Sequence, residues 1–477
     1  MLMIEDKIPN VGYSEKELFS SLEKLKCKDI DWKNGKTFGA VYYPGYKYAK
    51  VISKAYNLFM HENAFDPQLF KSLLAMENTL VKQVSQLFSN KNFIYGNLTS
   101  GGTESIFLAL LSAREWSHKY RKIENPEVVL SSTAHPAFLK AMRFLKIKPV
   151  VIQANNQLSI DLDSFENAIN ENTILLVGSA PAYPYGMIDP IDELSKMALK
   201  HKLVLHVDAC IGGFLLSYLK KLGYQIPDFD LSLEGVSSIS VDLHKYAYAP
   251  KGSSIIYYRS EELRKNQFSI FSNWEGGIYA STSFMGTKPG GIVASSWAAL
   301  NHIGEDGYLK LTKKTMDATN IIKDYIENHD DLSLIGNPQM SLIAFKSDTM
   351  NIYQLADKLN DIGWYIGRLQ NPAGIHLVIS QIHADGAAQE FINDIDDIVT
   401  SIKNRPIKNT IGNAGDKIAA KILNLMSFNK LKHTLVKAAS KDKKSKNKKR
   451  IIYNVKQGLE FEDSDELFRS IMDGFYK

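Results

Sequence analysis

Short apolar runs alternate with segments of helical periodicity through the middle of the chain. The runs are rich in β-branched residues and cover 128–130, 149–152, 174–177, 203–207, 238–241 and 254–258. Between several of them, apolar residues fall at helical spacing over 136–145, 162–170 and 191–201. This alternation is typical of a mostly parallel β-sheet with helices on both faces, and such sheets bind ligands at the carboxyl ends of their strands.

The pattern differs on both sides of this central region. Helical spacing marks 70–88 before it, and a long helical stretch over 307–327 follows it. Further apolar runs at 342–345 and 376–379 enclose a helix near 352–362, which predicts a smaller α/β domain. We therefore predict four parts, which are an N-terminal segment (1–75), a large domain (76–305), a small C-terminal domain (306–408) and a terminal region (409–477).

The composition is that of a globular protein. Of the 477 residues, 44% are hydrophobic and 23% are charged, and the net charge of +5 is too small to indicate nucleic acid binding. The two cysteines, Cys27 and Cys210, favour a reducing compartment over a disulfide framework. The charged first ten residues do not resemble a signal peptide, and no apolar run reaches the roughly 18 residues of a membrane span. We expect a soluble, cytoplasmic protein, with peripheral membrane contact or delivery into a host cell as alternatives.

The terminal region has a different composition from the rest of the chain. Lysines crowd 417–450, and apolar residues such as Ile418, Ile422 and Leu425 lie among the first of them. Two interpretations stay open. The segment is either a basic amphipathic helix that docks on an anionic membrane, or a solvated lysine-rich helix followed by a linker.

A glycine-rich turn precedes a helical pattern over 106–120. It reads TSGGTES over residues 99–105. Backbone N–H groups at a helix N-terminus bind anions, and glycines allow a phosphate to approach closely. The same pattern also describes a plain turn with hydroxyl caps.

Two further residues could contact a flat cofactor. Asp208 follows the buried run 203–207 and could pair with a protonated pyridine nitrogen, which would keep a pyridoxal ring cationic. Its alternative role is to cap the turn that leads to a glycine pair. His135 follows another predicted strand and could stack on the cofactor ring, or could be a simple loop residue before Pro136.

Lys245 follows the strand-like run 237–241 and its neighbour is His244. A lysine in a partly desolvated site beside another cationic group has a lowered pKa and can attack an aldehyde. We therefore expect the pKa of Lys245 to be lowered, so that its amine forms a Schiff base with pyridoxal phosphate. The alternative is a solvated surface lysine, as most lysines are.

The order of these elements resembles that of the aspartate-aminotransferase-like pyridoxal-phosphate enzymes. Longer motifs give a finer match, and they are NLTSGGTESI (97–106), HVDACIGGF (206–214), HKYAYAPKGSS (244–254), WEGGIYAS (274–281) and GTKPGG (286–291). Together they resemble the sphingosine-1-phosphate lyases, within the group II pyridoxal-phosphate decarboxylase-like family, over about 39–404.

This resemblance implies a fold and a cofactor. The fold would be the aspartate-aminotransferase-like α/β fold (fold type I), with a mostly parallel sheet in the large domain and a smaller C-terminal α/β domain. Lys245 would carry pyridoxal 5'-phosphate, Asp208 would pair with its pyridine nitrogen and His135 would stack on its ring. The protein would be a homodimer with the site at the subunit interface, to which the N-terminal segment contributes.

The resemblance also implies which residues hold the cofactor phosphate. Gly102, Thr103 and His244 would contact it within one subunit. Gly286 and Thr287 would reach the phosphate of the neighbouring subunit.

The activity implied is a retro-aldol cleavage. A phosphorylated sphingoid base such as sphingosine 1-phosphate would yield a long-chain aldehyde and ethanolamine phosphate. Tyr42 and Lys251 match residues of the family that are implicated in catalysis, and the proton from the C3 hydroxyl could go to either of them or to a phosphate group.

The chain departs from the family at a few positions. Ala247 replaces a glycine after the lysine, and Asp66 stands where the animal enzymes have a histidine near the substrate. The basic region 417–450 is an insertion. The alternative activity is amino-acid decarboxylation, which uses the same cofactor but needs a site for a carboxylate; the decarboxylases lack the APKGSS continuation at 249–254.

Overall fold

The computed structural model describes residues 7–66, 68–89, 95–404, 465 and 469. The chain divides into two compact units, one of Gly39–Tyr353 with Gly367–Ile392 and the other of Met1–Phe38, Gln354–Ile366 and Asn393–Lys477. All the site residues predicted from the sequence belong to the first unit. The four-part division of the chain stays a prediction, and the basic region 417–450 lies outside the described residues.

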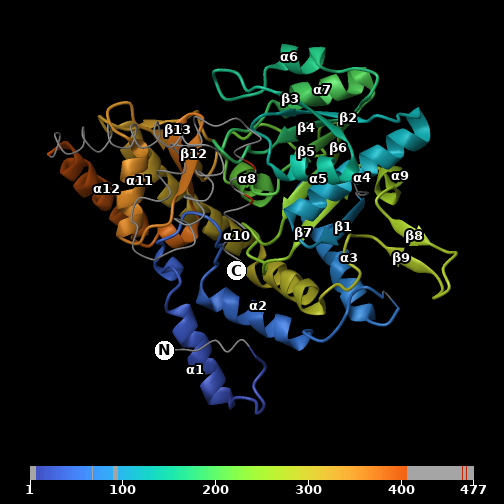
Figure 1. Ribbon diagram of the computed structural model, residues 1–477, viewed down its shortest axis with the longest axis horizontal. Helices are drawn as coiled ribbons and strands as arrows, with labels where there is room; N and C mark the ends of the chain where they lie inside the picture. Colours follow the sequence, from blue (N-terminus) through green and yellow to red (C-terminus); the bar gives the residue numbers. More distant parts are fainter. Residues whose placement is uncertain (1–6, 67, 90–94, 405–464, 466–468, 470–477) are drawn as a thin grey trace. The chain divides into compact units, whose positions relative to one another are not determined.

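The first unit is built on a seven-stranded sheet with the order β1-β7-β6-β5-β4-β2-β3 (Figure 1). Its strands are β1 (Tyr95–Thr99), β2 (Glu127–Ser131), β3 (Lys148–Ile152), β4 (Thr173–Ser179), β5 (Val204–Asp208), β6 (Val236–Asp242) and β7 (Ser254–Tyr258). Strands β6, β5, β4, β2 and β3 are parallel, and β7 is antiparallel to both of its neighbours. The predicted mostly parallel α/β architecture is therefore confirmed.

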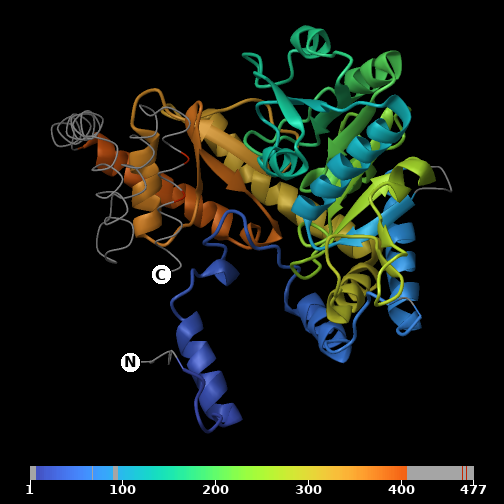
Figure 2. The same cartoon turned by 45° about the vertical axis from the view of Figure 1, so that its right-hand side comes forward.

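Helices cover both faces of this sheet. They are α2 (Tyr46–Leu58), α3 (Lys71–Ser85), α4 (Gly102–Arg121), α5 (Ala137–Leu145), α6 (Leu162–Asn167), α7 (Ile191–His201), α8 (Gly212–Lys221) and α9 (Glu261–Lys265). Successive strand residues point to opposite faces, so Val128 and Leu130 pack with α4 and α5 while Val129 packs with α7 and α8. In Figures 1 and 2 the cyan helices α4 and α5 lie side by side on one face.

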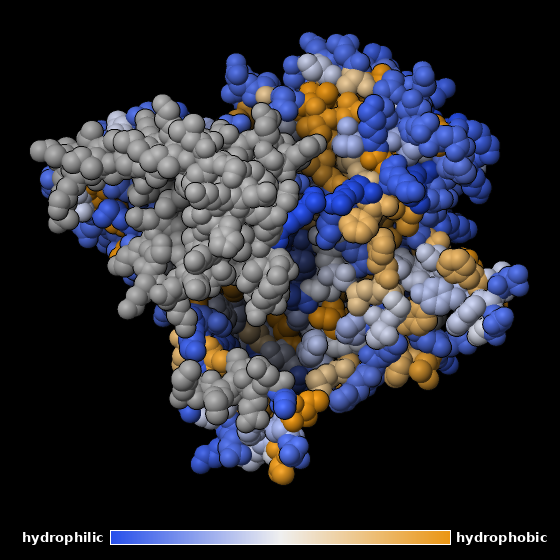
Figure 3. Space-filling model, viewed as in Figure 1, coloured by the Kyte–Doolittle hydropathy of each residue, from blue (hydrophilic) through white to orange (hydrophobic). Residues whose placement is uncertain are grey.

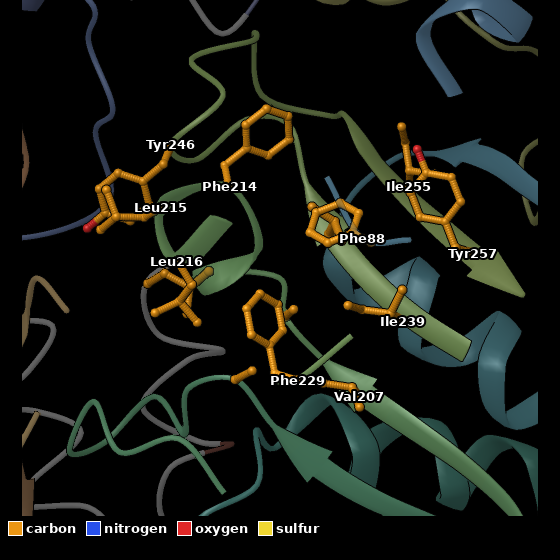
Figure 4. Close-up of a cluster of buried hydrophobic side chains, with 14 of the residues drawn as sticks. Phe88, Val207, Phe214, Leu215, Leu216, Phe229, Ile239, Tyr246, Ile255 and Tyr257 are labelled. Carbon is orange, nitrogen blue, oxygen red and sulfur yellow. The ribbon is translucent and has the colours of Figure 1, made fainter. Parts of the chain in front are cut away.

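The core on the α8 face lies directly behind the strand ends that form the site. Figure 4 shows Phe214 of α8 and Phe88, which follows α3, together with Ile239 of β6 and Val207 of β5. All four side chains are at most 2% exposed. Burial of a side chain of this size stabilises the fold by about 1.5–3 kcal/mol, so β5 and β6 rest on a well-packed support.

A smaller antiparallel sheet has the order β10-β11-β13-β12. Its strands are β10 (Ser333–Leu334), β11 (Leu342–Lys346), β12 (Gly367–Gln370) and β13 (Ala373–Val378). It is connected to the large sheet through α10 (Gly290–Glu327), which bends at Gly304, where φ is +64°. Strands β8 (Ser269–Phe271) and β9 (Tyr279–Ser281) form a separate hairpin. The four strands of this smaller sheet lie within the predicted small domain and belong to the first compact unit.

The described part of the second unit is small. It contains α1 (Glu15–Lys26) and the 3-10 helix Trp32–Asn34, and α11 (Ile352–Asp361) and α12 (Ala387–Lys403) each have residues in both units. Within it Trp364 stacks on Phe38, donates a hydrogen bond of 2.6 Å to Asp394 and lies 4.0 Å below Nζ of Lys36. Among the described residues, no helix is both long and apolar enough to cross a bilayer.

Candidate active site

A cavity of about 410 Å³ lies at the carboxyl ends of the parallel strands. It is lined by the glycine-rich turn at residues 100–103, by His135 and Tyr183, and by Asp208, Asp242, His244 and Lys245 at or just beyond the ends of β5 and β6. The structure therefore brings together six residues that the sequence predicted to hold a cofactor, namely Gly102, Thr103, His135, Asp208, His244 and Lys245.

The glycine-rich turn joins β1 to the N-terminus of α4. The first N–H groups of a helix have no acceptor within the helix, and the helix dipole adds partial positive charge there. Gly101 is in the left-handed region with a φ of +148°. At Gly102 an added Cβ would lie 2.7 Å from Sγ of Cys210 and 2.8 Å from Oδ1 of Asp242. The backbone of the turn therefore packs too closely on β6 for any side chain at Gly102.

Lys245 forms a buried ion pair that the sequence did not predict. Its Nζ lies 2.9 Å from Oδ2 of Asp242, the last residue of β6, whose side chain is 2% exposed. Burial by itself lowers the pKa of Lys245, but the charge of Asp242 outweighs burial and raises that pKa above its usual range. The expectation of a lowered pKa is therefore wrong, because the nearest charged partner is an anion and not His244.

His244 faces the same carboxylate. Its Nε2 lies 3.5 Å from Oδ2 of Asp242, and its Nδ1 donates a hydrogen bond of 2.7 Å to the carbonyl oxygen of Ser253. Burial lowers the pKa of His244, the charge of Asp242 opposes this effect, and the charges of Lys251 and Lys245 lower the pKa further. The ring is held with one edge toward the cavity and beside the glycine-rich turn, 3.5 Å from the Cβ position of Gly101.

Asp208 lies at the end of β5 on the floor of the cavity. It is 8% exposed, and its Oδ1 accepts hydrogen bonds from the backbone N–H of Cys210 at 3.0 Å and from the hydroxyl of Ser240 at 3.4 Å. The neighbouring His206 points into the core, where Ser238 and Ser240 satisfy both ring nitrogens. Asp208 is thus held rigidly with its carboxylate available to the cavity, whereas His206 is a structural residue.

His135 lines the cavity shortly after the end of β2. It begins the segment that leads into α5, and its Nδ1 accepts a hydrogen bond of 3.2 Å from the N–H of Ala137. Tyr183 meets its ring edge-on at 6.2 Å and in turn packs on the buried His376 at 4.6 Å. The His135 ring is therefore held in place at the cavity wall.

Lys251 and Tyr42 form a pair next to the cavity. Nζ of Lys251 lies 4.8 Å from the centroid of the Tyr42 ring and 3.2 Å from the carbonyl oxygen of His244. Burial of the amine and the charge of Lys245 lower the pKa of Lys251 to about 8. Burial, followed by the charges of Tyr183 and Asp242, raises the pKa of Tyr42 well above its usual range. Near neutral pH the lysine can lose its proton easily, and the tyrosine keeps its own.

Gly286 and Thr287 do not line the cavity in the described chain. They belong to the loop 282–288 between β9 and α10, and Thr287 is exposed. Their neighbours Met285 and Lys288 line a second cavity of about 260 Å³, which shares Ser100 and Glu104 with the first and also includes Lys251. The expected contact of Gly286 and Thr287 with a neighbouring subunit stays a prediction.

Pyridoxal phosphate fits this set of residues. The close packing at Gly102 leaves the N-terminus of α4 bare for an anion, which suits a phosphate. Lys245 faces the same cavity with a side chain 23% exposed, which suits an amine that must reach an aldehyde. Asp208 supplies a buried carboxylate for a ring nitrogen, and His135 supplies a flat face.

Three site residues were not anticipated from the sequence, although two of them had a signal in it. Asp242 comes directly after a predicted apolar run, as Asp208 does, and it is the last residue of β6. Glu104 lies in the first turn of α4, three residues after the N-cap, which is the spacing of a capping carboxylate. Tyr183 lies in an irregular segment, and no sequence pattern marked it.

This chain is similar to several known proteins. The conserved-domain profile of the pyridoxal-dependent decarboxylases matches residues 1–348. The sphingosine-1-phosphate lyase 1 of Rattus norvegicus is 40% identical, with 85% of this chain and 72% of the relative aligned. The lyase of Oryza sativa is 39% identical, with 84% and 76% aligned. A solved sphingosine-1-phosphate lyase of Burkholderia pseudomallei superposes with a TM-score of 0.79 at 32% identity, covering 86% of this chain and 96% of that one.

Proposed function

Because this chain belongs to the pyridoxal-dependent decarboxylase family and, within it, to the sphingosine-1-phosphate lyases, we propose that it cleaves phosphorylated sphingoid bases between C2 and C3. The products are a long-chain aldehyde and ethanolamine phosphate. The observation that carries this proposal is the pairing of a cofactor cavity around Lys245 with an adjacent amine, Lys251, whose pKa is lowered to about 8. A retro-aldol cleavage needs such a proton acceptor in addition to the cofactor.

The cofactor is held by residues of one cavity. In our proposal the N-terminus of α4 at Gly102 and Thr103, with His244, would hold the cofactor phosphate, and Lys245 would hold the aldehyde end. Asp208 would keep the pyridine nitrogen protonated, and His135 would pack on the ring. When bound, pyridoxal phosphate supplies the electron sink that takes up the electron pair released on C2.

Lys251 and Tyr42 handle the protons. The neutral amine of Lys251 takes the proton from the C3 hydroxyl, the C3–O bond becomes a carbonyl and the C2–C3 bond breaks. The proton is then returned to C2, so no water or other reactant is consumed. Tyr42 keeps its phenolic proton and donates a hydrogen bond to the C3 oxygen. The opposite pKa shifts of the two residues support this division of roles.

The active form is a homodimer with the site at the subunit interface. The hairpin β8–β9 exposes large apolar side chains, with Ile270 and Phe271 each 61% exposed and Ile278 78% exposed. Figure 3 shows orange and pale residues at the surface on the side where this hairpin lies. The loop 282–288 follows the hairpin directly, so a partner that covers the hairpin would bring Gly286 and Thr287 to its own cofactor phosphate.

The enzyme works in a reducing compartment such as the cytoplasm. Both Cys27 and Cys210 are free thiols, which supports this placement. Docking on a membrane through 417–450 would bring the enzyme to a lipid substrate, and liposome co-sedimentation of the full chain with and without that segment tests it.

The test of the function separates carbon–carbon cleavage from decarboxylation. The purified protein is incubated with a phosphorylated sphingoid base and, separately, with a panel of amino acids, and aldehyde and carbon dioxide are measured. We expect aldehyde and ethanolamine phosphate from the lipid, and we expect Lys245→Ala to abolish both turnover and the absorbance of lysine-bound cofactor. Carbon dioxide from an amino acid without any aldehyde from the lipid would assign decarboxylation instead.

A further inference from the structure

A buried carboxylate bridges the glycine-rich turn and the loop 282–288. Glu104 is 7% exposed and lies in the first turn of α4. Its Oε2 accepts a hydrogen bond of 2.6 Å from the backbone N–H of Ser100, and its Oε1 accepts one of 2.6 Å from the N–H of Phe284. The Phe284 ring also packs edge-on against Phe107 of α4 at 5.3 Å. One side chain therefore joins two segments that are 180 residues apart in the sequence.

The loop is held at two other points as well. At its start, Gln267 donates a hydrogen bond of 2.8 Å to the carbonyl oxygen of Thr282. At its end, Lys288 forms an ion pair with Glu77 at 2.7 Å, with both side chains at most 13% exposed. Glu104 holds the middle of the loop, immediately before Gly286 and the exposed Thr287. Without it, this part of the loop keeps the hydrogen bond of Gln267 to Thr282, the hydrogen bonds of the Ser281 hydroxyl of β9 and the Phe284 ring contact.

The charge of Glu104 opposes the function of the turn that it holds. A phosphate bound at the N-terminus of α4 would lie near this carboxylate, and two negative charges repel each other in a medium of low dielectric constant. Electrostatics alone therefore predicts that a neutral side chain at this position would improve phosphate binding. The geometry predicts the opposite, because the buried carboxylate supplies two acceptors to two backbone donors in partly buried hydrogen bonds.

We propose that Glu104 is a positioning residue that fixes the phosphate-binding turn and the loop 282–288 relative to each other, so that both cofactor sites of the dimer depend on it. This inference rests on the proposed function for the identity of the cofactor and for the dimer. Within its own subunit Glu104 orients the N–H groups of the turn. Through Phe284 it orients the loop that carries Gly286 and Thr287 toward the partner's site.

The first test is Glu104→Gln. Glutamine has nearly the same shape, but it replaces one acceptor by an NH₂ group that faces an N–H and leaves that donor unpaired. We expect the dissociation constant of pyridoxal phosphate to rise about tenfold or more, measured by absorbance titration of the dialysed full-length protein. Hydrogen exchange of the amides in 282–288 should become faster. Glu104→Asp keeps two acceptors on a shorter side chain and should recover part of the affinity.

The control lies on the same helix. Glu115 pairs with Arg114 at the surface, and Glu115→Gln removes the same charge from α4 without touching the turn. We expect cofactor affinity and hydrogen exchange to be unchanged in this variant. Tighter cofactor binding in Glu104→Gln would mean that its charge dominates, and an unchanged dissociation constant would mean that the bridge is dispensable; either result overturns the proposal.

Mixed dimers separate the two effects of Glu104. One mixed dimer combines a Lys245→Ala subunit with a Glu104→Gln subunit. Its single remaining Lys245 lies beside the altered turn of its own subunit and next to the unaltered loop 282–288 of the partner; this lysine is called the competent lysine. The other mixed dimer combines a wild-type subunit with a subunit that carries both Lys245→Ala and Glu104→Gln. Here the competent lysine lies beside the unaltered turn of its own subunit and next to the altered loop 282–288 of the partner. Borohydride trapping of cofactor on the lysine reports only the competent site, and we expect weaker binding in both dimers. Loss confined to the first dimer would overturn the effect on the partner.

These readouts also keep the inference distinct from the proposed function. They measure cofactor binding and not turnover, so a different substrate would leave them intact. If the wild-type protein bound no pyridoxal phosphate, the proposed function would fail. If the wild type bound it and the Glu104 variants matched it, only the inference would fail.

Discussion

At the scale of single residues, the lowered pKa of Lys251 predicts how the catalytic activity depends on pH. Partial burial of the amine and the charge of Lys245 together lower this pKa to about 8. If the neutral amine is the proton acceptor, about a tenth of the enzyme is competent at pH 7 and most of it at pH 9. We therefore expect kcat/KM to rise about tenfold between these pH values, and this limb should vanish in Lys251→Arg, whose guanidinium stays charged.

The control for this measurement is Lys265→Arg, which changes an exposed lysine of α9 that pairs with Glu261. Its pH profile should match that of the wild type. A Lys251→Arg variant that keeps the full alkaline rise would assign the limb to another group, and the proton would then have to go to a different acceptor.

The residues themselves were easier to predict than their electrostatics. Lys245, Asp208 and His135 were recognised because each follows a strand in a pattern that resembles a known family. The direction of the pKa shift of Lys245 could not be predicted in the same way, because it depends on which charge approaches Nζ most closely. His244 is adjacent in sequence, but Asp242 is closer in space, at 2.9 Å.

At the scale of elements, the close packing of the turn between β1 and α4 predicts that a single added methyl group, in Gly102→Ala, affects stability and cofactor binding. A Cβ at Gly102 would lie within 2.8 Å of both Cys210 and Asp242, so Gly102→Ala must push the turn away from β6. We expect a loss of stability of about 1–3 kcal/mol and a weaker affinity for pyridoxal phosphate, measured by thermal unfolding with and without cofactor. Gly12→Ala, where an added Cβ meets no atom within 4 Å, should change neither quantity. Unaltered cofactor binding in Gly102→Ala would show that the turn does not contact the phosphate.

The elements that the sequence predicted are those with a strong periodic signal. The runs that became β2 to β7 are rich in β-branched residues, and α5 and α7 show clear helical spacing. Strand β1 was missed because its sequence, YGNLT, has no apolar alternation and, within the described part of the chain, the strand lies at the sheet edge beside β7. Helix α8 was missed because it begins with two glycines, which read as a turn; at Gly212 an added Cβ would lie 2.1 Å from the carbonyl oxygen of Ala180. In both cases tertiary packing, which a single sequence does not display, outweighs local preference.

At the scale of the whole molecule, the sequence predicts a dimer from resemblance alone, and the structure adds an exposed apolar hairpin where the partner would bind. Large apolar side chains on one exposed hairpin are unusual for a monomer and are typical of the centre of an interface. Because the loop 282–288 follows this hairpin, a substitution that disrupts the interface at the hairpin should also disrupt the cofactor site.

The last prediction uses the double substitution Ile270→Lys and Phe271→Asp in β8. Both side chains are 61% exposed in one subunit, so charged residues there cost the isolated fold little, but in an interface they would be buried without partners. We expect sedimentation equilibrium to show monomers and lyase activity to be lost, because each site would lack Gly286 and Thr287 of its neighbour. Leu199→Lys, at an apolar residue 48% exposed on α7, is the matched control and should leave the dimer and the activity intact. A double variant that sediments as a dimer would exclude the hairpin from the interface. A monomer with full activity would show instead that each subunit builds its site alone, and the contribution of Gly286 and Thr287 across the interface would then be wrong.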